Sequence, residues 1–206
     1  MAETKKEAYA ILGNLVTAVN LLQSCPEFTL LIPEVRVNIA YALPDARTPR
    51  QVAAVPGRIT AVCGMPYASG MPAWGASDHL ARRILEIRKY DREINAAMNF
   101  KCDRAIIEVV EQYCRERSLL FGWLDRSEEP EDVKESNGSS MPWKVKQLVQ
   151  KYGAVPKLFY EKATWGKEPL FLALGKDAVE VAAVAIEIAR RLKSQLLELS
   201  GKKPPQ

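Results

Sequence analysis

The single histidine of the chain, His79, lies where a loop runs into an expected helix. Ser77 is a typical N-cap residue, so His79 is predicted in the first helical turn, beside backbone N–H groups that have no helical acceptor. Such a position suits phosphate binding, and an imidazole there suits proton transfer. Ser77 and Asp78 would add a hydroxyl group and a carboxylate to this site, unless Asp78 only favours the helix dipole. The alternative is a capped surface helix that happens to contain a histidine.

A second candidate for anion binding is Arg58, which follows Pro56-Gly57 at the start of an expected strand. The backbone can approach a ligand closely at a glycine. A guanidinium group stays charged and binds phosphate oxygens in pairs. Arg58 is therefore predicted to hold a phosphate-like group, or else it is a solvated surface arginine.

Further polar side chains are predicted to line the same pocket or to be ordinary polar residues of strands. Arg36 and Asn38 alternate with apolar residues and would project from the polar face of the first expected strand. Asn99 and Lys101 bracket the end of another strand. Either pair would place hydrogen-bond donors near a ligand.

Two later stretches carry charge that suits a ligand site or a solvated surface. Asp125, Arg126 and Glu129 begin an acidic loop, where a carboxylate could recognise a polar ring or help to hold Mg²⁺ on a phosphate. The stretch Gly166-Lys167-Glu168 invites comparison with a P-loop, but it lacks the glycine-rich lead and the Ser/Thr.

The composition excludes several classes of protein. The 206 residues carry a net charge of +4 that is spread along the chain, without the basic patch and motif of a nucleic-acid-binding protein. No apolar run is long enough to span a bilayer, and the charged N-terminus is unlike a signal peptide. A cytoplasmic protein without nucleic-acid or membrane partners is expected.

The cysteines do not suggest a metal site. None of the four pairs with another at the C-x-x-C spacing of metal ligands, and there is one histidine. A zinc site is therefore not expected, and the cysteines are predicted to be free thiols. They are Cys25, Cys63, Cys102 and Cys114.

The elements that must position these residues alternate along the chain. Hydrophobic periodicity predicts strands over 34–42, 57–63, 95–100, 119–124 and 157–160, and helices over 4–22, 48–54, 78–90, 103–117, 140–153 and 177–199. Residues 64–76 and 126–139 are expected to be long loops, the second a mobile flap, and 201–206 a tail. Strands that alternate with helices predict one α/β domain over residues 1–200, with helices on both faces of a sheet.

The candidate residues fall in six short segments, which are residues 31–42, 55–59, 75–82, 99–103, 125–130 and 166–170. Each segment alone is a weak motif. Together and in this order they resemble the ThiN-type thiamine-phosphate synthase family, found mainly in archaea. The resemblance runs from about Tyr9 to the last helix, so it covers nearly the whole chain.

The resemblance implies a fold and an activity. The fold would be a three-layer α/β/α sandwich with a mixed sheet, like the class II aldolase (AraD-like) fold, in a homodimer. The activity would join a pyrimidine diphosphate to a thiazole phosphate, giving thiamine phosphate and pyrophosphate, with Mg²⁺ as a possible partner of pyrophosphate. Arg58 would hold the departing pyrophosphate, and His79 would donate a proton to it or hydrogen-bond a phosphate. Catalytic members of the family carry both residues, and regulators fused to a DNA-binding domain lack them.

The chain departs from the family pattern at one place. An Asp-Arg-Gly-Gly-like stretch usually precedes the Gly166 segment, but here the residues are Glu161-Lys162-Ala163-Thr164-Trp165. This departure leaves open a sensor that binds thiamine phosphate without turnover. An aldolase-like metalloenzyme is the third reading, and a single histidine argues against it because such enzymes need several. A separate protein is expected to supply the pyrimidine diphosphate.

Overall fold

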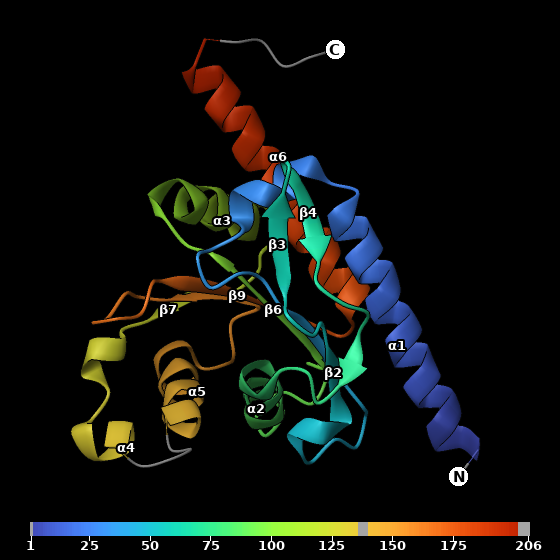
Figure 1. Ribbon diagram of the computed structural model, residues 1–206. Helices are drawn as coiled ribbons and strands as arrows, with labels where there is room; N and C mark the ends of the chain where they lie inside the picture. Colours follow the sequence, from blue (N-terminus) through green and yellow to red (C-terminus); the bar gives the residue numbers. More distant parts are fainter. Residues whose placement is uncertain (1, 136–139, 202–206) are drawn as a thin grey trace.

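A computed structural model describes residues 2–135 and 140–201. Its centre is a seven-stranded sheet in the order β5-β2-β1-β6-β9-β8-β7 (Figure 1). The strands are β1 (Ile39–Ala42), β2 (Val52–Ala54), β5 (Ala73–Trp74), β6 (Ala96–Lys101), β7 (Phe121–Leu124), β8 (Leu158–Glu161) and β9 (Leu170–Gly175). The pair β7–β8 is parallel and the other pairings are antiparallel, so the sheet is mixed as predicted.

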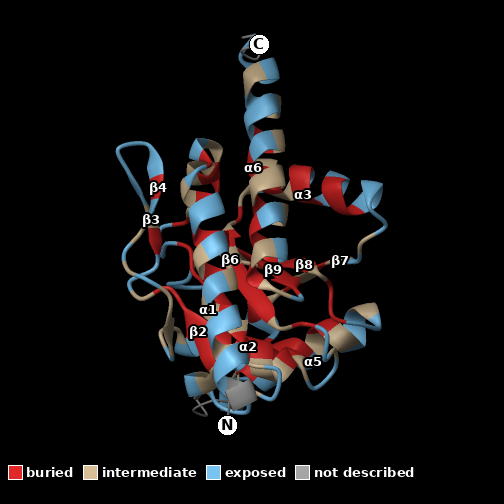
Figure 2. Cartoon of the chain, turned by 90° about the vertical axis from the view of Figure 1, so that its right-hand side faces the viewer, coloured by how far each residue is buried: buried red, intermediate tan, exposed pale blue. Residues whose placement is uncertain are grey.

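Helices cover both faces of this sheet (Figures 1 and 2). One face packs against α1 (Ala2–Gln23), the 3₁₀ helix η1 (Pro26–Leu31), α3 (Arg104–Glu116) and α6 (Ala178–Leu199). The other packs against α2 (Asp78–Ile87) and α5 (Ser140–Tyr152). No helix in the described ranges is long and apolar enough to cross a membrane.

The pleat of the strands separates two apolar cores and places the site. In β6, Met98 and Phe100 belong to the core under α1 and α6, whereas Ala97 points to the core under α2 and α5. Successive side chains alternate between faces, so Asn99 points to the α2–α5 side as well. By the same alternation Glu161 lies on the face of Phe159, on the α2–α5 side. Asn99 and Glu161 therefore lie on the same face of the sheet.

Smaller elements complete the fold. The hairpin β3 (Ile59–Val62) and β4 (Met65–Ala68) forms a separate two-stranded sheet, and η2 (Pro49–Gln51) precedes β2. The segment after β7 contains η3 (Arg126–Glu128) and α4 (Glu131–Glu135).

Three expectations for the first half of the chain were wrong. The strand predicted over 34–42 begins only at Ile39, because Pro33–Arg36 forms a turn in which Arg36 N donates to Pro33 O at 2.9 Å. The helix predicted over 48–54 is η2 followed by β2, because Val52–Ala54 pairs with β1. The expected loop 64–76 contains β4 and β5, two short strands among its prolines and glycines.

The second half of the chain also differs from the predicted elements. Strand β9 was not predicted, since an apolar run that is buried on both faces has no alternation. The expected flap over 126–139 contains η3 and α4. Residues 136–139 of the flap and 202–206 of the tail lie outside the described residues.

Candidate active site

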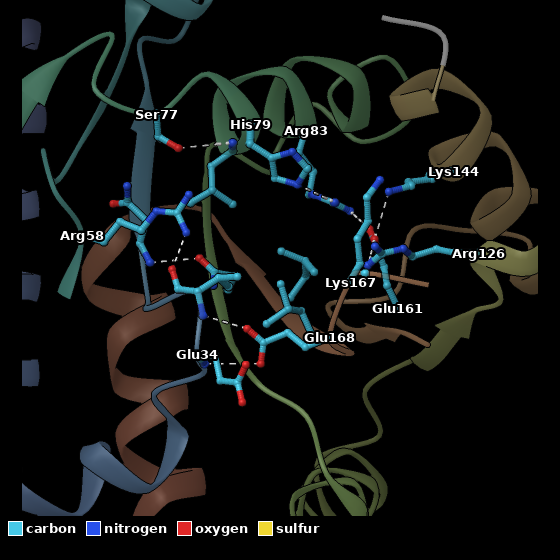
Figure 3. A pocket seen from close by; sticks show the side chains of 17 residues that line it. Glu34, Arg58, Ser77, His79, Arg83, Arg126, Lys144, Glu161, Lys167 and Glu168 are labelled. Atoms are coloured by element: carbon cyan, nitrogen blue, oxygen red, sulfur yellow. Dashed lines mark hydrogen bonds and ion pairs between the residues drawn. The ribbon is translucent and has the colours of Figure 1, made fainter. Parts of the chain in front are cut away.

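A cavity of about 410 Å³ opens between the start of α2, the strands β6, β8 and β9, and the turns before β1 and β9 (Figure 3). Leu170 and Leu172 of β9 give it an apolar wall. A shallower hollow continues it along Gly57 and Arg58 toward Arg36. The cavity thus combines an apolar surface with charged groups from several distant segments.

The start of α2 lies at this cavity as predicted. Ser77 is the N-cap, and its hydroxyl oxygen accepts from Leu80 N at 3.4 Å. This hydrogen bond satisfies one of the free N–H groups of the first turn. Asp78 forms an exposed ion pair with Arg82 at 2.6 Å and lines the shallow hollow. An exposed pair of this kind adds little stability.

His79 is held by a residue one turn further along α2. Arg83 Nη2 lies 3.2 Å from His79 Nε2. A guanidinium can only donate, so Nε2 accepts and the proton of the neutral ring is assigned to Nδ1. His79 is accessible through the cavity mouth, yet desolvation there and the charge of Arg83 lower its pKa to about 4. At neutral pH His79 is therefore an uncharged ring with Nδ1–H as its donor.

Glu161, at the end of β8, is the centre of a buried charged cluster. Its carboxylate lies 2.6 Å from Arg83 Nη1, 3.0 Å from Lys144 Nζ and 3.4 Å from Arg126 Nη1. All four residues are buried and line the cavity. Burial alone would raise the pKa of Glu161, but the cations Arg83, Lys144 and Arg126 lower it to about 2. The carboxylate therefore stays ionised among three positive charges.

Arg58, to the left of His79 in Figure 3, and Glu168, below it, hold the turn before β1. Arg58 Nη1 donates to Val35 O, while the Glu168 carboxylate accepts from Val35 N at 2.7 Å and Glu34 N at 3.3 Å. Gly57 and Arg58 both have positive φ angles, of 71°, which turn the chain sharply before β3. This turn places the exposed Arg58 side chain at the cavity.

Two asparagines hold the backbone beside the cavity. Asn38 is buried: its Oδ1 accepts from Ile39 N and Val55 N at 2.9 and 3.1 Å, and its Nδ2 donates to Val55 O at 3.1 Å. Asn99 Oδ1 accepts from Asn38 N at 2.9 Å, and Asn99 Nδ2 donates to Arg36 O at 3.0 Å. The expectation that Arg36 and Asn38 project from the polar face of a strand was therefore wrong, since Arg36 lies in a turn with φ of 66° and Asn38 replaces backbone partners.

The Gly166 segment forms a tight turn at the cavity. Thr164 and Lys167 exchange two backbone hydrogen bonds of 2.9 and 3.1 Å, and Gly166 has a φ of 70°. The turn brings Gly166, Lys167 and Glu168 to the wall. Lys167 forms no ion pair within the described ranges, so its ammonium group is available to a ligand.

Most of the predicted site residues line the cavity or its hollow, and their roles stay predictions. These residues are Arg36, Asn38, Arg58, Ser77, Asp78, His79, Asn99, Arg126, Gly166, Lys167 and Glu168.

Three predicted residues are not among the cavity-lining residues. Lys101 pairs with Asp103 at 3.0 Å beyond the cavity, because it stands at the last position of β6. Asp125 caps η3 and pairs with Lys162 at 3.0 Å; the Ser127 hydroxyl group and Lys162 lower its pKa to about 2. Glu129 is the C-cap of η3 and is buried. Local pairing and capping, rather than a ligand, account for these positions of Lys101 and Asp125.

Four charged wall residues were not predicted from the sequence. Arg83 follows His79 by four residues, and this spacing places both side chains on one face of the helix. The spacing was therefore a signal that Arg83 lies at the cavity beside His79. Lys144 reads as an ordinary solvated residue of an amphipathic helix. Glu34 and Glu161 had no local signal, since what brings them to the cavity is the packing of distant segments.

Known proteins are similar to this chain in sequence and in structure. A family model described as thiamine-phosphate synthase ThiN matches residues 14–187. Thiamine-phosphate synthase ThiN of Methanothermobacter thermautotrophicus is 39% identical over 181 residues, which cover 88% of this chain and 93% of that protein. The bifunctional thiamine biosynthesis protein ThiDN of Methanocaldococcus jannaschii is 37% identical over 188 residues, which cover 91% of this chain and 42% of that protein.

A solved structure agrees with these matches. The crystal structure of the C-terminal domain of a phosphomethylpyrimidine kinase has a TM-score of 0.82 and 35% identity, covering 90% of this chain and 100% of that one. The match over residues 14–187 includes every segment that lines the cavity. The chain belongs to the ThiN family of thiamine-phosphate synthases.

Proposed function

We propose that this protein is a transferase that joins hydroxymethylpyrimidine diphosphate to thiazole phosphate, with release of pyrophosphate and formation of thiamine phosphate. Family membership supports this activity. The observation that carries it is the cavity itself: Arg58 and the cations around Glu161 lie on opposite sides of it (Figure 3), and leucine side chains add apolar surface to its lining. Two substrates that each carry an aromatic ring and an anionic group match this arrangement.

The reaction requires no covalent bond between the protein and either substrate. The bond between the pyrimidine methylene carbon and a diphosphate oxygen breaks, and the lone pair of the thiazole nitrogen forms the new C–N bond. Positive charge develops on the carbon while negative charge develops on the leaving pyrophosphate. Positioning of both rings and fixed positive charge near the leaving group therefore supply the catalysis.

Arg58 and His79 are proposed as the residues that act on the reacting groups. Arg58 offers a fixed cation at the cavity mouth, where it stabilises pyrophosphate as charge builds on its oxygens. The sequence left open whether His79 gives up a proton or donates a hydrogen bond. Its lowered pKa favours the second role, in which Nδ1–H donates to a phosphate oxygen.

Mg²⁺ is proposed to enter with the diphosphate rather than to occupy a site of its own. No group of three or more His, Cys, Asp or Glu side chains in the described ranges could hold a metal ion. Glu34 is a carboxylate at the cavity wall, and together with diphosphate oxygens it offers the oxygen donors that Mg²⁺ prefers. Bound there, Mg²⁺ would neutralise charge on the leaving group. No zinc site is proposed.

The finer features rest on the sequence: the dimer on the family resemblance, and the location and the excluded partners on composition and charge. We propose a homodimer located in the cytoplasm, with small-molecule substrates and without nucleic-acid or membrane partners. The class II aldolase-like (AraD-like) assignment of the three-layer fold stays a prediction.

The activity is tested by incubating the purified chain with Mg²⁺, pyrimidine diphosphate and thiazole phosphate. We expect thiamine phosphate and pyrophosphate in equal amounts, detected by chromatography with mass spectrometry. A protein in which both Arg58 and His79 are replaced by alanine is the control for contaminating activity. Tight binding of thiamine phosphate without turnover under any metal would instead support the sensor.

A further inference from the structure

We propose that the buried cluster of Arg83, Arg126 and Lys144 around Glu161 is an anion subsite that binds a phosphate group. The identity of the molecule that carries this phosphate rests on the proposed function, whereas anion binding itself does not. The subsite lies across the cavity from Arg58, with His79 between them (Figure 3).

The first argument is the charge balance of the cluster. Three cations face one carboxylate, and His79 adds no charge when neutral, so a net charge of about two positive units is buried. The side chains are nearly enclosed, with exposed fractions of 1% for Arg83, 3% for Glu161 and 7% for both Arg126 and Lys144. Buried charge is costly unless it is compensated. An anion bound in the cavity would compensate it.

The second argument is that two guanidinium groups have unused donors. Arg83 Nε and Nη1 are buried and donate no hydrogen bond within the described ranges, since the 2.6 Å contact with Glu161 is an ion pair without hydrogen-bond alignment. Arg126 reaches Glu161 only at 3.4 Å, and its side chain donates no hydrogen bond to the described part of the chain. Buried donors of this kind are normally satisfied. Phosphate oxygens, which accept several hydrogen bonds each, suit them.

A purely structural ion-pair network fits these facts less well. Such a network would balance its charges and satisfy its donors. Here desolvation lowers the pKa of Lys144, and the neighbouring Arg83 and Arg126 act in the same direction, so Glu161 does not fully compensate the ammonium group. Lys167, at the same wall, adds a further cation that an incoming phosphate would meet.

A two-ended cavity also explains how two anionic substrates can bind together. Leu170 and Leu172 lie in the wall and offer apolar surface to the rings. If one phosphate group binds at the cluster, the other can bind at Arg58 without repulsion at close range. Because Arg58 is proposed to hold the diphosphate of the pyrimidine, the cluster takes the phosphate of the thiazole, and kinetics can check this assignment.

The first test measures binding of inorganic phosphate by titration calorimetry in Arg126→Gln and Lys144→Met proteins. Each substitution should weaken binding by about tenfold or more, because a charge-assisted hydrogen bond or a buried cation is lost. Arg104→Gln, at an exposed position of α3, and Lys162→Met, next to the cluster but paired with Asp125, are the matched controls. Unchanged affinity in the folded Arg126→Gln protein would overturn the subsite.

The second test removes a negative charge from the cluster instead of a positive one. Glu161→Gln removes the only carboxylate among the four cluster residues, so inorganic phosphate should bind more tightly, although the protein without ligand should melt at a lower temperature. Asp125→Asn is the control, because this nearby carboxylate pairs with Lys162 and does not line the cavity. Equal or weaker binding by folded Glu161→Gln would show that the carboxylate only organises the fold. If Glu161→Gln does not fold, the Arg126→Gln result decides.

Steady-state kinetics then identify the phosphate source. An increase of KM for one substrate alone in Arg126→Gln assigns the subsite to that substrate. The calorimetric result does not depend on turnover. If the protein binds inorganic phosphate through the cluster but makes no thiamine phosphate, the proposed activity is refuted and the subsite stands.

Discussion

Arg58 is the residue on which the proposed reaction depends most directly. Arg58→Ala should lower kcat about a hundredfold or more, because loss of one preorganised contact to a developing charge costs about 3 kcal/mol. Arg58→Lys should recover part of the rate, since an ammonium group cannot form the paired hydrogen bonds of a guanidinium. The positive φ at this position disfavours alanine and lysine as it does arginine, so folding should be comparable. Steady-state kinetics would measure this, with the exposed Arg104→Ala variant as control. Near-normal turnover of Arg58→Ala would contradict the assignment of Arg58 to the active site.

The state of His79 can be measured directly because the chain has no other histidine. Nitrogen-15 NMR of the folded protein should show a neutral Nδ1–H ring at neutral pH and a titration midpoint near 4, well below the ordinary value of about 6.5. Arg83→Met should raise the midpoint, since the nearest cation is lost while Glu161 remains, and Lys144 and Arg126 still oppose protonation. The unfolded chain in urea is the control. A folded midpoint near 6.5, or a proton on Nε2, would contradict the assigned geometry.

At this scale the sequence predicted the residues that lie at turns and caps. Ser77, His79 and Arg58 were found because N-caps and Pro-Gly turns leave local signals. Arg83 and Glu161 were not predicted, because the ion pair that they form joins positions 78 residues apart in the sequence. The sequence does not distinguish a buried lysine such as Lys144 from a solvated one, because its partner Glu161 lies in a distant segment.

Among the elements, the junction of β1 and β2 is where the cavity begins. The two strands pair from Ala40 and Ala54 onward, and beyond that point the side chain of Asn38 bonds to Val55 in place of a backbone ladder. Asn38→Ala should therefore destabilise the fold by about 3 kcal/mol, because the buried N–H groups of Ile39 and Val55 and one carbonyl oxygen lose their partners. Chemical denaturation would measure this. Asn20→Ala, on the exposed side of α1, is the control, and equal stability of both variants would refute the assignment.

Sequence reasoning predicted the long amphipathic helices well and the short strands poorly. Helices α2, α3 and α6 have an apolar stripe and a capping residue, so their positions follow from local pattern. Strand β9 is central and buried on both faces, so its apolar run had no period to detect. The turn at Pro33–Arg36 alternates like a strand but ends in a positive φ, which no hydrophobic pattern shows. The strand order depends on packing between distant segments, which leaves no local signal in the sequence.

The whole molecule should hold its fold without a metal ion. Three of the four cysteines are buried thiols, Cys63 is exposed, and none forms a disulfide in the described ranges. Two large apolar cores, one on each face of the sheet, stabilise the chain instead. A chelator such as EDTA should therefore leave the melting temperature unchanged, even where it lowers activity by removing Mg²⁺ from the diphosphate. Differential scanning fluorimetry would measure this, and a fall in melting temperature that zinc reverses would contradict it. Pyrophosphate provides the positive control in the same assay: it should raise the melting temperature, because a ligand that binds only the folded state stabilises it.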